Sequence, residues 1–233
     1  MGVDPLDDVL LVAIHPDRRE GLRLSERLPA CDPDALWSRA AEHGVELALA
    51  RAVRTAHDVD ARFLVRARDT VQAAHARTED QLRCLTAADA ALAGAGIPAL
   101  WLRGPALSVA AFGDPFARRP GRDLDLLVRS EHLHRAQVAA PGIDVADRAP
   151  GLTAPFASLF ARSRTVELGG RQVRTLADPD HVAVLQARAA GRWRFGDWLD
   201  LASLLGSEAG PPPVKGRVRR LLRRLRGRLR DNR

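Results

Sequence analysis

The hydrophobic pattern of this 233-residue chain changes at Gly96. Over residues 6–95, apolar side chains recur at intervals of three and four, which predicts a layer of amphipathic helices. After Gly96, short apolar runs alternate with turns rich in Gly and Pro. The runs at 97–102, 123–128 and 143–146 are typical of buried strands. The two patterns together predict an α+β fold, in which helices precede and follow a small mixed β-sheet.

Turn and linker residues divide the chain further. The Gly-Gly pair at 169–170 separates two alternating runs, which predicts a β-hairpin. Asp178-Pro179 is typical of a helix start, and we expect His181, just beyond it, at the surface. Three prolines after Gly210 form a stiff linker. We therefore expect four sections: an N-terminal helical region (1–95), an α/β core (96–176), C-terminal helices (177–209), and a linker with a basic amphipathic tail (210–233).

The positive charge of the chain is concentrated in that tail. The net charge of +7 and the pI of about 11.0 would by themselves favour a nucleic-acid partner. Residues 215–233, however, hold ten basic residues and one acidic residue, whereas residues 1–214 hold 26 basic and 28 acidic residues. The tail is therefore +9 and the body is −2. We expect the tail at 214–233 to contact nucleic acid or an anionic membrane surface, or to pack on the body through its leucines.

Several classes of protein do not fit the sequence. It has no run of about 18 uncharged apolar residues, so we expect no transmembrane segment. The first residues lack the positive charge and the cleavage pattern of a signal peptide. Cys31 and Cys84 lack the spacing of metal ligands and are typical of free thiols in the cytoplasm. We therefore expect a cytoplasmic protein.

The strongest chemical signal is the pair Asp123 and Asp125. Residues two apart in a strand project from the same face, and two carboxylates placed in this way repel unless a cation lies between them. Mg²⁺, which takes oxygen ligands and substrate phosphates, supplies such a cation. The preceding run ends at Arg103-Gly104, a turn into a short helix that can present N–H groups to phosphate. Arg103 and Arg119 could neutralise phosphate oxygens. The spacing alone leaves open an exposed strand face with two solvated aspartates.

Two segments carry a family resemblance. Residues 102–107 read Leu-Arg-Gly-Pro-Ala-Leu, and residues 119–128 read Arg-Pro-Gly-Arg-Asp-Leu-Asp-Leu-Leu-Val. Both resemble the bacterial uncharacterised nucleotidyltransferase family of the polymerase-β-like superfamily. Weaker similarity in the flanks extends the resemblance over most of residues 30–205. It implies a nucleotidyltransferase core within the α+β fold.

The resemblance also implies roles for individual residues. Gly104 opens the helix that holds the nucleoside triphosphate, and Arg103 and Arg119 belong to the same binding site. Asp123 and Asp125 bind Mg²⁺, and a third carboxylate on a neighbouring strand completes the metal and catalytic site. Our candidate for the third carboxylate is Asp144, with two residues in reserve, Asp147 and Glu167.

The implied reaction moves a nucleoside monophosphate from an NTP, for which we expect ATP, to an acceptor hydroxyl and releases pyrophosphate. The acceptor would be a small molecule, a peptide or a protein. Three departures from the family pattern leave an alternative open. Arg103 stands where the family has Lys, Ala146 stands where it has His, and only fourteen residues separate Val128 from Ile143, a shorter connection than the family usually has. That alternative is a catalytically degenerate adaptor or antitoxin-like binding module. A metal-dependent glycosyltransferase also uses Asp-x-Asp, but the long helical region before the motif disfavours it.

Overall fold

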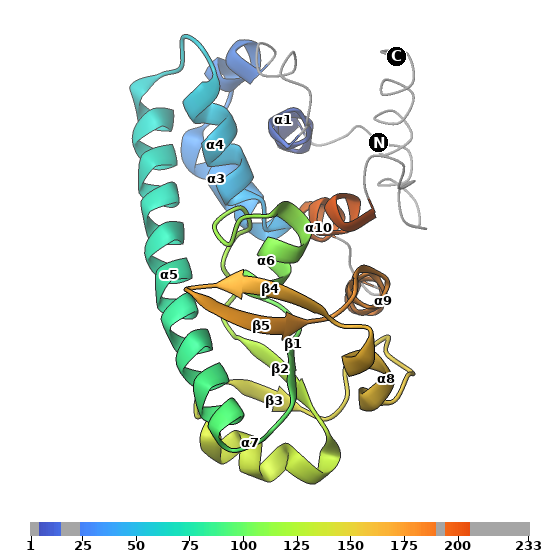
Figure 1. Ribbon diagram of the computed structural model, residues 1–233. Coiled ribbons are helices and arrows are strands. Elements are labelled where there is room, and N and C mark those ends of the chain that lie inside the picture. The colour runs from blue at the N-terminus through green and yellow to red at the C-terminus, as the bar shows by residue number, and fades with distance from the viewer. Residues whose placement is uncertain (1–4, 15–23, 190–193, 206–233) are drawn as a thin grey trace. The chain divides into compact units, whose positions relative to one another are not determined.

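The structure, a computed structural model, describes residues 5–14, 24–189 and 194–205 (Figure 1). Helices and a five-stranded mixed sheet in these residues form an α+β fold, which confirms the predicted fold class. The chain divides into two compact units: unit 1 comprises residues 1–70 and 189–233, and unit 2 comprises residues 71–188. The predicted tail at 210–233 lies outside the described residues. None of the described helices is both long enough and apolar enough to cross a membrane.

Unit 1 is helical where it is described. Its α-helices are α1 (Pro5–Ala13), α3 (Pro33–His43), α4 (Glu46–Thr55), the first turns of α5 (Ala61–Gly94), and α10 (Phe195–Leu205). α1 packs against α3 and α4. Where α3 ends, the His43 ring stacks on Phe195 of α10 with a centroid distance of 4.1 Å. α10 begins with a close backbone approach, because a Cβ on Gly196 would lie 2.8 Å from the Gly44 carbonyl oxygen.

Unit 2 contains the sheet. Its strands are β1 (Ala99–Trp101), β2 (Asp125–Val128), β3 (Asp144–Ala146), β4 (Arg164–Leu168) and β5 (Arg171–Thr175). The strand order is β3-β2-β1-β5-β4. β1 pairs with β2 antiparallel and with β5 parallel, while β2 and β3 are parallel. β4 and β5 form the hairpin predicted at Gly169 and Gly170, both of which have positive φ.

The two faces of the sheet have separate hydrophobic cores. On one face, Leu126 and Val128 of β2 belong to a core with Leu85 of α5 and with α6 (Pro105–Phe112) and α7 (Leu133–Ala139). On the other face, which we name the α8 face, Leu127 belongs to a core with Leu159 of α8 (Phe156–Ala161) and Val184 of α9 (Asp178–Ala189). Because side chains alternate along a strand, Asp125 lies on the α8 face with Leu127.

Three strands are shorter than predicted. β1 covers 99–101 instead of 97–102, β2 begins at Asp125 instead of Asp123, and β3 begins at Asp144 instead of Ile143. β2 is short because the two strands that pair with it, β1 and β3, are short. The ladder between β1 and β2 ends with the hydrogen bond from Leu102 N to Asp125 O, because the chain then turns into α6. β3 begins at Asp144, whose N–H donates to Leu124 O. Asp123 thus lies in the loop before the strand.

Candidate functional site

The turn between β1 and α6 requires a glycine at its centre. Gly104 has φ 68° and ψ −142°, a conformation that residues with a Cβ rarely adopt. A Cβ at this position would also lie 2.8 Å from Cδ2 of Leu124. Pro105 follows as the first residue of α6, and Gly104 O accepts a hydrogen bond from Ser108 N at 3.1 Å. The sequence therefore fixes a sharp entry into α6 next to the strand that carries Asp125.

Arg103 and Asp125 form an ion pair across this turn. The guanidinium Nη2 of Arg103 donates to Oδ1 of Asp125, and the two side chains are 25% and 13% exposed. The second carboxylate oxygen, Oδ2, is buried and has no hydrogen-bond partner among the described residues. A buried polar atom in this state costs free energy unless a ligand satisfies it. Oδ2 of Asp125 is therefore available to bind a cation or to accept a hydrogen bond from an N–H or O–H group of a ligand.

Asp144 lies beside Asp125 in the sheet. The two residues are register partners on the parallel strands β3 and β2, which places their backbones about 4.8 Å apart with both side chains on the α8 face. Asp144 is exposed, as is Asp123 in the loop before β2. The structure thus places Asp144 next to Asp125. Within the described ranges, no three or more His, Cys, Asp or Glu side chains are grouped as a metal site.

The two reserve carboxylates lie away from Asp125. Asp147 follows β3 and accepts a hydrogen bond from the Ser130 hydroxyl at 2.8 Å. Glu167 is an exposed residue of β4, and β1 and β5 lie between that strand and β2. Of the three candidates for the third carboxylate, only Asp144 is a direct neighbour of Asp125 in the sheet.

The loop that carries Arg119 is held at both ends. At its start, the Ser108 hydroxyl donates to Asp114 O at 2.7 Å and accepts from Arg118 N at 3.1 Å. At its end, Gln81 of α5 donates from Nε2 to Gly121 O at 3.0 Å. Arg119 is exposed between these two anchors.

Gln81 is a site residue that the sequence analysis did not identify. Its Oε1 is buried without a hydrogen-bond partner, and it would lie 4.0 Å from a Cβ on Gly104. It stands 40 positions before Gly121 in a long helix, and nothing in the local pattern distinguishes it from the other polar residues there. Two buried acceptors, on Gln81 and Asp125, thus belong to the surroundings of this turn.

A buried histidine supports the end of β1. The Thr175 hydroxyl contacts Trp101 O at 2.6 Å and His181 Nε2 at 3.0 Å. A hydroxyl has one proton, so Thr175 donates to the carbonyl and accepts from Nε2–H of neutral His181. Burial lowers the pKa of His181 to about 4. The expectation that His181 lies at the surface is wrong: it is 1% exposed, because the start of α9 turns it toward Thr175 in the sheet.

The chain was compared with protein-family models, with curated proteins and with solved structures. A family model described as uncharacterised nucleotidyltransferase matches residues 29–140. The matched segment contains the turn at Gly104, the loop with Arg119, and both Asp123 and Asp125, and it ends before Asp144. Searches of curated proteins and of solved structures gave no match.

Proposed function

We propose that the chain is an enzyme that moves a nucleoside monophosphate from an NTP, with ATP as the expected co-substrate, to an acceptor hydroxyl. The match of residues 29–140 to the uncharacterised nucleotidyltransferase family supports this proposal. The acceptor oxygen forms a bond to the α-phosphorus, while the bond from that phosphorus to the bridging oxygen breaks and pyrophosphate leaves. The hydroxyl proton passes to a nearby carboxylate, for which Asp144 is the candidate.

The observation that carries this proposal is the environment of Asp125. Its Oδ2 is buried and unpartnered among the described residues, Arg103 binds its other oxygen, and Asp144 is its register partner. The glycine turn into α6 lies next to this group. A cation, a guanidinium and a tight backbone turn are the elements with which proteins hold phosphate groups.

Mg²⁺ fits the residues present. Asp125 Oδ2 is a carboxylate oxygen without a hydrogen-bond partner, which is the kind of ligand that Mg²⁺ takes. Mg²⁺ is commonly held by one or two carboxylates together with substrate phosphates, so Asp125 with Asp123 or Asp144 would be sufficient. When bound, Mg²⁺ would neutralise charge on the phosphate oxygens. Arg103, which neutralises Asp125 in this structure, would then be able to turn toward a phosphate oxygen.

The same ion pair also favours the alternative function. If the guanidinium of Arg103 permanently neutralises Asp125, the chain would be a catalytically degenerate binding module that uses the fold as an adaptor. The acceptor class, the cytoplasmic location and the partners of the tail stay predictions from the sequence.

Binding and turnover separate the two functions. The full chain would be titrated calorimetrically with Mg-ATP, Mg-UTP and Mg-UDP-glucose, and pyrophosphate release from each NTP would be measured with and without Mg²⁺. An active enzyme should bind Mg-NTP and release pyrophosphate, and the double variant Asp123→Ala/Asp125→Ala should lose both properties. Asp80→Ala, which removes a 64%-exposed carboxylate of α5, is the matched control.

Each of the other results has a defined meaning. Undiminished release by the double variant would contradict the assignment of these aspartates. Failure of the wild-type chain to bind nucleotide at about millimolar concentration would favour the degenerate module. Turnover of UDP-glucose instead of NTP would favour glycosyl transfer.

A further inference from the structure

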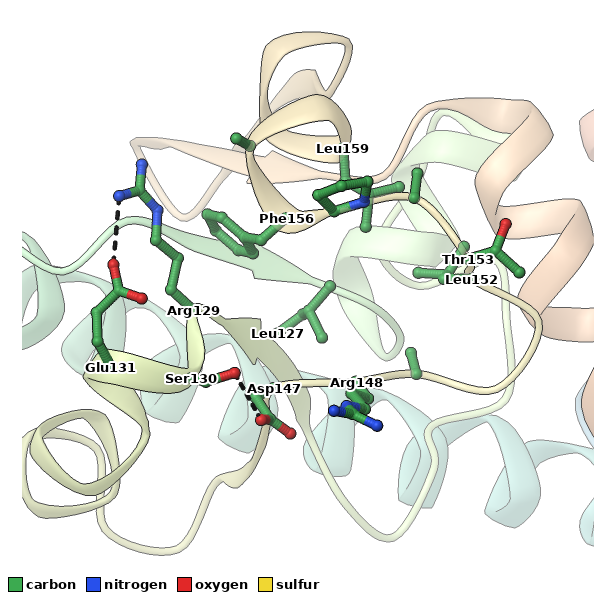
Figure 2. Close-up of a pocket in the computed structure, with 14 residues that line it drawn as sticks. Leu127, Arg129, Ser130, Glu131, Asp147, Arg148, Leu152, Thr153, Phe156 and Leu159 are labelled. Atoms are coloured by element: carbon green, nitrogen blue, oxygen red, sulfur yellow. Dashed lines mark hydrogen bonds and ion pairs between the residues drawn. The ribbon is translucent and has the colours of Figure 1, made fainter.

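A pocket lies on the α8 face of the sheet, at the carboxyl ends of β2 and β3 (Figure 2). Its volume is about 680 Å³, within the range of small-molecule sites. Three segments line it: the end of β2 with the 3-10 helix η2 (Ser130–His132), the residues after β3, and the segment leading into α8. Arg129 is four residues beyond Asp125, or about 13 Å along an extended strand. Leu127, which also lines the pocket, is two residues from Asp125 on the same face, so the pocket borders the candidate phosphate site and extends away from it beyond the ends of β2 and β3.

One wall of the pocket is apolar. Leu127 and Leu159 are buried core residues whose side chains reach its lining. The half-buried Phe156 lies beside Leu127 and Leu159 in Figure 2, and its ring stacks on Phe160 with a centroid distance of 5.6 Å. The guanidinium carbon of Arg129 lies over the Phe156 ring, 5.9 Å from its centroid. An aliphatic or aromatic body would be desolvated against this wall.

The polar wall carries the cation Arg148, which has no hydrogen-bond or ion-pair partner in the part of the chain that the structure describes. Arg129 pairs with Glu131 at 3.4 Å, and Ser130 donates to Asp147 Oδ2 at 2.8 Å. Arg148 also lines the pocket and is exposed, but among the described residues it takes part in no hydrogen bond or ion pair. Its guanidinium therefore has its full set of donors for a ligand. The carboxylates Glu131 and Asp147 would repel a highly charged anion such as a triphosphate.

We propose that this pocket binds a small amphipathic acid. Its apolar body packs against Leu127 and Phe156, and its single carboxylate or phosphate monoester pairs with Arg148. Arginine binds both kinds of anion through two parallel N–H donors, so the geometry of the wall fits either. This site is independent of the proposed nucleotidyl transfer, because binding here needs neither Asp125 nor Gly104.

Matched probes test the two halves of the proposal on the full chain. The probes are 4-phenylbutyrate, 4-phenylbutyl phosphate and the neutral 4-phenylbutan-1-ol, with binding measured by calorimetry or by ligand-observed NMR. At least one acid should bind about tenfold more tightly than the alcohol, because a hydrogen bond to a charged group is worth about this factor. The difference between the two acids identifies the preferred anion.

Two variants and one control assign the contacts. Arg148→Gln should weaken binding of the acid about tenfold and leave the alcohol unchanged. Phe156→Ala should weaken binding of all three probes. Arg83→Gln removes a 71%-exposed arginine of α5 and should change nothing. Thermal unfolding would confirm that each variant is folded.

Results of three kinds would overturn the proposal. One is that no probe binds in a saturable manner up to about 10 mM. Another is that acid and alcohol bind equally, or that Arg148→Gln binds the acid like the wild-type chain. The third is competition between the acids and Mg-ATP, which would make the pocket a part of the nucleotide site.

Discussion

Two arginine–aspartate pairs in unit 2 have carboxylates that are about equally buried. They differ in how many of the carboxylate oxygens have a hydrogen-bond partner. Asp180 of α9 is 10% exposed, and each of its oxygens accepts a hydrogen bond from Arg162, at 2.7 and 2.8 Å. Asp125 is 13% exposed, but Arg103 contacts only Oδ1, and Oδ2 has no partner among the described residues. The first pair is closed and the second is open.

The difference separates a structural contact from a binding contact. In a bidentate arginine–carboxylate pair, both carboxylate oxygens accept hydrogen bonds from the guanidinium, and the pair holds two structural elements together. An open pair leaves a buried acceptor without a hydrogen bond, and this lowers the stability of the fold. Such an acceptor is retained where a ligand satisfies it. We therefore expect substitutions at Asp180 to affect folding and substitutions at Asp125 to affect function.

The largest expected effect concerns turnover. Asp125→Asn should lower pyrophosphate release about 10³-fold, because it removes charge that is preorganised toward the reacting phosphate. Its melting temperature should stay close to that of the wild-type chain. Asp180→Asn should show the reverse: a lower melting temperature and turnover within about twofold of wild type in the folded protein. Equal losses of turnover in the two variants would remove the distinction between the pairs.

The second effect concerns the stability of the protein at low pH, through His181, which is next to the closed pair. His181 lies next to Asp180, and burial lowers its pKa from 6.5 to about 4. The unfolded chain therefore binds a proton at a higher pH than the folded chain. Stability is fully present above pH 6.5 and is lost as the pH falls toward 4, by about 3 kcal/mol in total.

Urea unfolding at pH 7, 5.5 and 4 measures this loss. The variant His181→Gln has no titrating group at this position and should lose about 3 kcal/mol less than wild type over the same range. Wild-type and variant curves that stay parallel over this range would contradict the assignment of a neutral, buried His181.

The smallest effect comes from paired Arg→Lys substitutions. Arg162→Lys should lower the melting temperature by a few degrees, because an ammonium cannot reproduce the bidentate geometry. Arg103→Lys should change the melting temperature less, since only one guanidinium nitrogen contacts Asp125. Calorimetric melting of both variants measures the difference. A larger shift for Arg103→Lys would show that the open pair also holds the fold together.

Part of the fold and site was predictable because it depends on local pattern. Alternating runs around two glycines predicted the β4–β5 hairpin, and the change at Gly96 located the start of the sheet. The strand limits were not predictable in this way: β2 begins at Asp125 because its neighbours are short. Gln81 was missed because its contact with Gly121 crosses 40 positions of sequence.

The sequence by itself determined the class of fold and the chemical character of the site. Helical and strand periodicity decide which faces of each element are apolar, and glycine is the residue that tolerates the φ of 68° at position 104. Only the tertiary structure decided that Asp144 is the register partner of Asp125, that Arg103 neutralises one oxygen of Asp125, and that His181 is buried. The physical reason is that burial and partner choice depend on strand pairing and packing between residues far apart in sequence, which no local pattern encodes.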